Sequence, residues 1–277
     1  MTRFLALLLA LMTGTQARAE LPRVVSTGVC ADQYVVALAA PGQIAGLSPD
    51  ARKASLSPIA TQAAHYATVP TNLEALLAAS PDLVIGEGYV AARMKPFLEA
   101  HGIAVMPMPA PETLDGVAQA LRDLGRALAR SEAGDEAARA FNAARTALAA
   151  TRPAQPPPAL YLLPTGTTAG AGTFIDEVMR LGGYSNLAAD RGIKGWAHVP
   201  LETLVRTPPD IVLAGFFDMA ATTALAGFSA APLTRRTLAH AKVIAIPDAL
   251  WVCPGPALID AARSLRAQVS TARETAQ

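Results

Sequence analysis

The sequence of 277 residues is poor in cysteine, aromatic residues and charge. Two cysteines, Cys30 and Cys253, are too few for the disulfide framework of a small secreted domain, and a chain of this length needs none. With 23 basic and 22 acidic residues, the formal net charge is +1, and no Lys/Arg cluster forms a stripe. The composition therefore gives no reason to expect a nucleic-acid partner.

Long hydrophobic runs are also missing, except near the first residue. Arg3 is followed by an apolar run from Phe4 to Met12 and by the small-x-small sequence Ala17-Arg18-Ala19. This arrangement predicts a secretory signal peptide at residues 1–19, which is too short to span a membrane. We expect an exported, periplasmic protein without membrane insertion. The absence of a cysteine at the cleavage site favours a free protein over a lipid-anchored one.

Motifs of common enzyme and metal sites are missing as well. There is no Gly-x-Ser-x-Gly elbow, and no Cys/His or paired-carboxylate arrangement can be argued. The histidines have no metal-ligand spacing: His65, His101, His198 and His240. The glycine-rich segment PTGTTAGAG lacks the Lys-Ser/Thr of a phosphate loop, so close backbone approach explains it better than nucleotide binding. We therefore expect neither catalytic residues nor a protein-bound metal.

What the sequence does contain is a helix-turn-strand unit that occurs twice. Residues 72–85 read NLEALLAASPDLVI and residues 200–213 read PLETLVRTPPDIVL. In each, apolar residues at i, i+3 and i+4 predict a short amphipathic helix, a Pro-Asp turn ends it, and an apolar run begins a strand. Two copies so far apart indicate two lobes of similar build. Glu74 and Glu202 occupy the same place in the copies, as solvated helix residues or as a pair that grips a symmetric partner.

Strands alternate with helices in both halves of the chain, which predicts parallel sheets flanked by helices. Between the halves, residues 132–150 have high helix propensity and no proline, and a proline-rich exit follows. We therefore expect an amino-terminal α/β lobe at residues 20–131, a linker helix with its exit at 132–158, and a carboxy-terminal α/β lobe at 159–277. A helical linker with a stiff exit predicts modest closure.

The loops that follow the predicted strands define a candidate ligand cleft. In open α/β sheets, ligands bind outside the carboxyl ends of the strands. If the two lobes face each other, a mostly aromatic and nearly uncharged set of side chains converges: Cys30, Tyr89, Trp196, Phe216, Phe217, Trp251 and Cys253. The two cysteines could form a disulfide beside the cleft, supply soft metal ligands, or remain unreactive thiols.

Several of these segments together resemble one known family. They are RVVSTGVCADQ, both repeats and the helix at residues 132–150. The chain resembles the class III periplasmic substrate-binding proteins of ABC importers, which bind cobalamin, haem or ferric siderophores. The resemblance implies two Rossmann-like lobes joined by one long rigid helix, with ligand captured between them. It also implies a monomer that works with a dimeric permease, and Glu74 and Glu202 match the glutamates that dock each lobe onto permease arginines.

The resemblance implies a bulky metal chelate as ligand, with the cobalt or iron carried by the ligand and no cofactor of the protein's own. A corrinoid suits an aromatic pocket of Trp196, Trp251 and Phe216, whereas an anionic ferric siderophore calls for arginines, for which Arg93 and Arg191 are candidates. Haem is an alternative, although the chain has no clear Tyr/His axial pair beyond Tyr89 and His198. A direct Zn or Mn receptor and a redox or chelate-processing enzyme that uses the cysteines are further alternatives.

Overall fold

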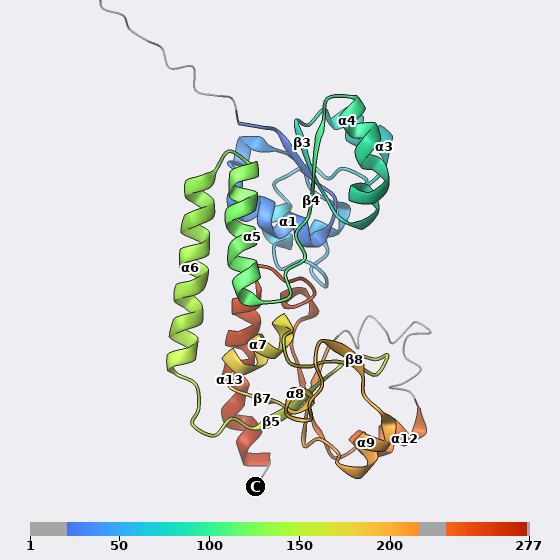
Figure 1. The fold of residues 1–277 in the computed structure, drawn as a ribbon, viewed down its shortest axis with the longest axis vertical. Coiled ribbons are helices and arrows are strands. Elements are labelled where there is room, and N and C mark those ends of the chain that lie inside the picture. Colours follow the sequence, from blue (N-terminus) through green and yellow to red (C-terminus); the bar gives the residue numbers. More distant parts are fainter. Residues whose placement is uncertain (1–20, 216–230, 276–277) are drawn as a thin grey trace, which may run out of the picture.

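Two α/β lobes lie one above the other in the computed structural model, which describes residues 21–215 and 231–275 (Figure 1). A long helix, α6 (Ser131–Ala150), runs along one side of both lobes. The predicted signal peptide lies outside the described residues. No helix in the described ranges combines the length and apolar character that a membrane crossing requires.

The amino-terminal lobe is built on a four-stranded parallel sheet in the order β2-β1-β3-β4. Its strands are β1 (Val24–Ser26), β2 (Ile44–Gly46), β3 (Leu83–Gly86) and β4 (Ala104–Pro107). Its α-helices are α1 (Val29–Leu38), α2 (Ala60–Ala63), α3 (Leu73–Ala79), α4 (Lys95–Ala100) and α5 (Leu114–Ala127). Shorter turns are η1 (Pro41–Gln43), η2 (Pro49–Arg52) and the π-helical η3 (Val90–Met94). The expected alternation of strands and helices is confirmed.

The carboxy-terminal lobe repeats the design with a parallel sheet in the order β10-β9-β5-β7. The strands are β5 (Pro158–Leu162), β7 (Ser185–Asn186), β9 (Ile211–Ala214) and β10 (Lys242–Ala245). The helices are α7 (Phe174–Leu181), α8 (Leu187–Asp190), α9 (Leu201–Arg206), α12 (Pro232–Leu238), α13 (Leu258–Thr275) and the 3₁₀ turn η5 (Asp248–Leu250). A two-stranded antiparallel ribbon joins β6 (Thr167–Ala169) to β8 (Trp196–His198).

The two sequence repeats occupy equivalent places in the lobes. Helix α3 leads into β3, which lies between β1 and β4, and α9 leads into β9, which lies between β5 and β10. Asn72 caps α3 by accepting the N–H of Ala75 at 2.9 Å. Ser80 ends the helix in a left-handed conformation just before Pro81, where a further helical turn would lack an N–H donor. The repeat therefore encodes a central strand and the helix before it.

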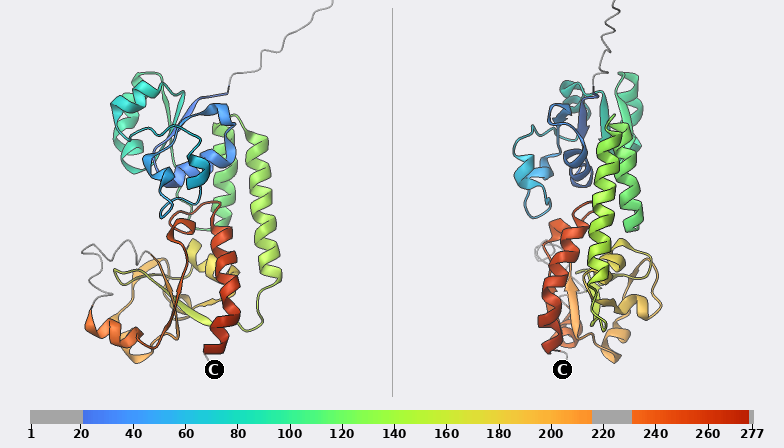
Figure 2. Two further views of the ribbon diagram at one scale, coloured as in Figure 1. Left: turned by 180° about the vertical axis from the view of Figure 1, so that it is seen from behind. Right: turned by 90° about the vertical axis from the view of Figure 1, so that its left-hand side faces the viewer.

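The helix between the lobes is paired rather than isolated. Helix α5 packs along α6, and the views of Figures 1 and 2 show the two side by side. Where they cross, a Cβ on Gly125 would lie 2.7 Å from Gly134 Cα, so only glycine permits this approach. The start of α5 reaches the other lobe, because the Leu114 N–H donates to Glu177 Oε2 at 2.7 Å. The connection is thus a helical hairpin anchored at both ends.

The largest hydrophobic core is shared by both lobes. It includes Tyr34 and Leu121 of the amino-terminal part, Phe141 of α6, and Trp251 and Leu265 of the carboxy-terminal lobe. Two smaller clusters fill the opposite faces of the sheets, one under α3 and α4 and one under α8 and α9. Separating the lobes would expose part of the shared core, and this favours small relative motions.

Candidate functional site

The carboxyl ends of strands from both lobes meet at one interface, where a disulfide joins them. Cys30 lies in the first turn of α1, just after β1, and Cys253 lies in the loop between β10 and α13. Their sulfur atoms are bonded at 2.00 Å with the Cα atoms 5.3 Å apart. Nearby, the Tyr34 hydroxyl donates to the carbonyl of Pro254 at 2.8 Å. Of the alternatives open from the sequence, the structure contains the disulfide.

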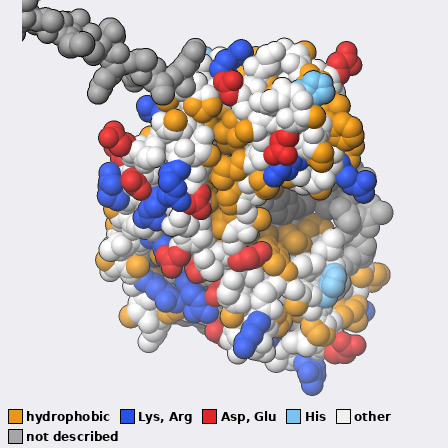
Figure 3. Space-filling view, turned by 45° about the horizontal axis from the view of Figure 1, so that its top comes forward, with side chains coloured by type: hydrophobic (Ala, Val, Ile, Leu, Met, Phe, Trp, Pro, Cys, Tyr) orange, Lys and Arg blue, Asp and Glu red, His pale blue; other side chains and the backbone are white. Residues whose placement is uncertain are grey.

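A hollow opens between the lobes on the side away from α6. Figure 3 shows it in one face of the molecule, with hydrophobic side chains visible in part of its wall. Strand β8 of the carboxy-terminal lobe lies below the amino-terminal lobe on the side away from α6 (Figure 1). This is the region where the strand-end argument places a ligand.

Two of the predicted cleft aromatics are exposed and come from opposite lobes. Tyr89 follows β3 and is 64% exposed, while Trp196 begins β8 and is 42% exposed. Trp196 is held from behind by edge contacts with Tyr161 and Phe174, whose ring centroids lie 6.2 and 5.9 Å away. Exposed aromatic rings fixed by packing are suited to contact a large apolar ligand face.

Trp251 differs from the expectation that it faces the cleft. Its side chain is 1% exposed and meets Tyr161 edge-on at a centroid distance of 5.2 Å. The turn η5 directs it into the shared core, so Trp251 supports the wall behind Tyr161 and Trp196. Cys253 is buried as well. Phe216 and Phe217, also predicted at the cleft, lie outside the described residues.

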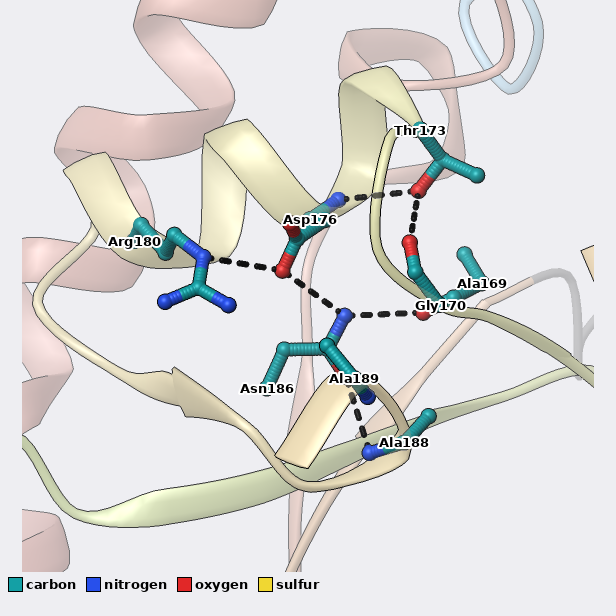
Figure 4. Close-up of polar contacts among 8 residues, drawn as sticks. All are labelled: Ala169, Gly170, Thr173, Asp176, Arg180, Asn186, Ala188 and Ala189. Atoms are coloured by element: carbon teal, nitrogen blue, oxygen red, sulfur yellow. Dashed lines mark hydrogen bonds and ion pairs between the residues drawn. The ribbon is translucent and has the colours of Figure 1, made fainter. Parts of the chain in front are cut away.

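A buried polar network fixes the ribbon that carries Trp196 (Figure 4). Asn186 donates to the Ala169 carbonyl of β6 at 2.8 Å and to Asp176 Oδ1 at 3.0 Å. Arg180 donates to the same carboxylate oxygen at 3.0 Å. Asn186 Oδ1 also accepts the N–H of Ala188 in the first turn of α8, so Asn186 caps this helix. The expected loop between α7 and α9 therefore folds as β7, α8 and β8, and its polar side chains tie these short elements to β6.

Two carboxylates at the amino-terminal strand ends were missed by the sequence analysis. Asp32 is completely buried in α1, where it accepts hydrogen bonds from the hydroxyls of Ser26 and Ser48 and, at 3.0 Å, from the N–H of Ser48. Burial raises the pKa of Asp32 to about 6 against these hydrogen bonds, and the charge of Glu87 adds to the rise. An acidic residue on the apolar face of a predicted helix was the available signal.

Glu87, the second carboxylate, follows β3 and reaches the first turn of α1. Its Oε1 accepts the N–H of Ala31 at 2.6 Å. Burial raises the pKa of this carboxyl, while hydrogen bonds from the backbone of Ala31 and Cys30 oppose the rise. Glu87 thus takes the place of a helix cap next to the disulfide.

The basic and histidine candidates are placed less favourably for a ligand at the strand ends. Arg191 donates to the carbonyl of Thr207 at 2.8 Å. Thr207 precedes the amino end of β9, which is the end of the strand opposite the cleft. Arg93 is exposed on η3, and His198 is exposed on β8. Among the described residues, no three His, Cys, Asp or Glu side chains lie close enough together to hold a metal ion.

The two repeat glutamates are exposed in the first turns of their helices. Glu74 lies in α3 and Glu202 in α9, and both helices lie on the side of the molecule away from α6 (Figures 1 and 2). Beside Glu202, a groove of about 420 Å³ is lined by Leu201, Val205, Arg206 and Leu233. Each lobe thus presents one equivalent acidic position on the same side.

Comparisons with known proteins agree with this architecture. A family model described as "Periplasmic binding protein" matches residues 24–250. A "Cobalamin-binding protein" of Halobacterium salinarum is 30% identical over 200 residues, which are 69% of this chain and 53% of the relative. The chain therefore spans about half the length of the curated relatives that it matches.

Solved structures of similar fold cover nearly the whole chain. The haem-binding protein RhuT from Roseiflexus sp. RS-1 has a TM-score of 0.67 at 22% identity, covering 93% of this chain and all of RhuT (100%). The haem-binding protein HutB of Vibrio cholerae has a TM-score of 0.69 at 23% identity, with coverages of 88% and 97%. The vitamin B12 binding protein BtuF of Vibrio cholerae has a TM-score of 0.61 at 21% identity, with coverages of 91% and 98%. At these identities the likeness establishes the fold, and the family match extends over most of the sequence. The chain therefore belongs to the periplasmic binding protein family.

Proposed function

We propose that this protein is the substrate-binding component of an ABC importer and captures a bulky metal chelate, either a corrinoid or a ferric siderophore, between its lobes. The observation that carries the proposal is the pair of exposed aromatics, Tyr89 and Trp196, which come from opposite lobes and follow or flank the strand ends where a ligand is expected. Chelates of this size have broad apolar faces that aromatic rings bind well. The names of the relatives and of the solved structures, which cite cobalamin, vitamin B12 and haem, support this ligand class.

The metal in this proposal arrives within the ligand, so the protein needs no cofactor of its own. We expect the role to be binding rather than catalysis, and the names of the relatives support this; the two cysteines are joined in a disulfide, and Cys253 is buried. A disulfide is consistent with an oxidising compartment, which supports export to the periplasm through the predicted signal peptide at residues 1–19. We expect the mature protein to act as a monomer.

A ligand panel tests the proposal. The mature protein would be screened by thermal shift against cobalamin, cobinamide, haem, several ferric siderophores, and free Zn²⁺ and Mn²⁺. A chelate present at about a hundred times its dissociation constant should stabilise the native state by about 2.7 kcal/mol and raise the melting temperature. A response to haem would select the haem alternative within this ligand class. A response to the bare ions alone would contradict chelate capture.

Docking to a dimeric permease is the second part of the proposal. Glu74 and Glu202 would each pair with a permease arginine, and the apolar groove beside Glu202 would receive a hydrophobic side chain. The double variant Glu74→Ala, Glu202→Ala should keep ligand affinity and lose uptake in cells. Glu136→Ala, which removes an exposed charge from α6, is the matched control. Intact uptake by the double variant at normal protein levels would refute the docking role.

A further inference from the structure

The amino terminus of α1 is occupied by a carboxylate of the chain itself. Gly28, the N-cap residue, offers no side chain to the free N–H groups of the first turn. Glu87 replaces the missing cap from the end of β3, accepting the N–H of Ala31 at 2.6 Å. A Cβ on Gly28 would lie 2.4 Å from Glu87 Oε2, so glycine at this position leaves room for the carboxylate. The sequence thus combines a small residue in one loop with an acid in another.

The position of Glu87 is fixed by its neighbours. Its own N–H donates to Thr27 Oγ1 at 3.1 Å, and the N–H of Thr27 donates to the Ile85 carbonyl at 3.2 Å. These bonds connect the loop after β3 to the loop after β1, directly beside the interlobe disulfide. Glu87 is therefore fixed at the carboxyl end of β3, where the strand-end argument places the ligand, and it is only partly buried.

A second carboxylate, Asp32, lies close enough to interact with the charge of Glu87, and in the described part of the chain neither one forms an ion pair. Arg93, the exposed arginine that follows Tyr89, forms no ion pair with them. An unfilled helix amino terminus attracts anions through its free N–H groups and its dipole. Here that attraction is satisfied internally by the Glu87 carboxylate, so an anionic ligand finds an acidic side chain in place of a free helix terminus.

From this arrangement we infer that the cleft selects neutral or cationic metal chelates over anionic ones, and that Glu87 is the residue that sets this preference. The inference deepens the proposed function and rests on it. A ligand with free carboxylates or deprotonated catecholates would meet repulsion from Glu87 and find no free helix terminus. A neutral or cationic corrinoid, or a ferric hydroxamate without excess negative charge, would not meet this repulsion. The chelate would contact the aromatics Tyr89 and Trp196 while its charge faces Glu87.

Two series of chelates, each matched in size and varied in charge, test the inference. The first comprises aquocobalamin, cyanocobalamin and sulfitocobalamin, which are cationic, neutral and anionic forms of one corrinoid. The second comprises ferrioxamine B, ferrichrome and ferric enterobactin, in the same order of charge. Dissociation constants would be measured by calorimetry at low and at physiological salt. In the series that binds, the anionic member should bind wild type at least about tenfold more weakly than the others, with a smaller difference at higher salt.

Three variants assign the preference to Glu87. Glu87→Gln should reduce the ratio of the dissociation constants of the anionic and cationic ligands about fivefold or more. Glu87→Asp, which keeps the charge, should retain the wild-type ratio even if α1 becomes less stable. Glu136→Gln removes an exposed charge far from the cleft and should change nothing. Melting temperatures and free-thiol titration would verify that each variant is folded with its disulfide formed.

The outcomes separate the inference from the proposed function. If wild type binds one series but prefers its anionic member, or if Glu87→Gln leaves the ratio unchanged, the charge preference is wrong while chelate capture stands. If wild type binds no member of either series and no chelate of the ligand panel, the proposed function fails and the inference fails with it.

Discussion

At the scale of the residue, burial gives two tryptophans different roles. Trp251 is enclosed in the core shared by the lobes, whereas the side chain of Trp196 is 42% exposed. Removing a buried ring leaves a cavity, and removing an exposed ring removes a contact surface for the ligand. The two substitutions therefore separate support of the site from contact with the ligand.

Trp251→Ala should lower the free energy of unfolding by about 3–5 kcal/mol, as expected for a large buried aromatic. Trp196→Ala should lower it by about 1 kcal/mol, since only the contacts with Tyr161 and Phe174 are lost, yet should weaken chelate binding at least about tenfold. Urea denaturation and calorimetry would measure both quantities. Equal stability losses in the two variants would contradict the assignment.

Asp32 predicts a pH dependence of stability. Its pKa is raised from 3.8 to about 6 in the folded state, so the folded protein holds this proton more tightly than the unfolded chain. The tighter binding of this proton contributes about 3 kcal/mol to the free energy of unfolding. The contribution is complete below about pH 4 and is lost as the pH rises through 6. Asp32→Asn should remove this component from the pH profile of the unfolding free energy. Parallel profiles of variant and wild type would show that Asp32 does not titrate in this way.

The exposure of a residue was predictable where its environment is local and was not predictable where distant segments determine it. The exposed positions of Glu74 and Glu202 follow from helix periodicity, and Tyr89 from its place after a strand. The pairing of Cys30 with Cys253 depends on how the lobes meet, so the sequence left three alternatives open. The inward turn of Trp251 and the approach of Glu87 to Gly28 also depend on distant segments, and no local pattern predicts them.

At the scale of the element, the strands and longer helices were predictable because each has its own hydrophobic periodicity. The repeats give α3-β3 and α9-β9, and the alanine-rich run gives α6 within one residue of its expected start. The β6–β8 ribbon was missed because its strands are three residues long and contain Thr, Ala and His without a hydrophobic alternation. Its position is determined by the Asn186 network rather than by its own sequence.

The crossing of α5 and α6 makes a prediction at this scale. A Cβ on Gly134 would lie 2.8 Å from the Leu121 carbonyl oxygen and 3.0 Å from Gly125 Cα, both backbone atoms that move only if the helices separate. Gly134→Ala should therefore destabilise the protein by about 1–3 kcal/mol, although alanine is the better helix former by about 1 kcal/mol. Glu136→Ala on the same helix is the control and should be neutral. A gain of stability in Gly134→Ala would show that the crossing is not tight.

At the scale of the whole molecule, three connections hold the lobes in place: the α5–α6 hairpin, the shared core and the disulfide. The sequence predicted one helix of the hairpin as the linker and, from that helix, only a modest closure of the lobes. The structure adds two constraints at the interface itself. Ligand capture in such a molecule would use small adjustments around the disulfide rather than a wide hinge motion.

Replacing both cysteines with serine tests the contribution of the disulfide. The bond closes a loop across a sequence separation of 223 residues, so its loss should lower the free energy of unfolding by about 2–5 kcal/mol. Chelate binding should persist with reduced affinity, because the cysteines bear no chemistry in the proposed function. Chemical denaturation and calorimetry would measure the two effects. Complete loss of function in a folded double variant would instead favour a redox role for the pair.

The most direct test of the central claim, capture of a chelate between the lobes, is a tryptophan-fluorescence titration of wild type beside Tyr89→Ala and Trp196→Phe. We predict saturable quenching with one chelate per protein. Tyr89→Ala on one lobe and Trp196→Phe on the other should each weaken binding, measured by the remaining fluorescence of Trp251 in the second variant. Unchanged affinity in either variant, or a response to free metal ions only, would contradict the account.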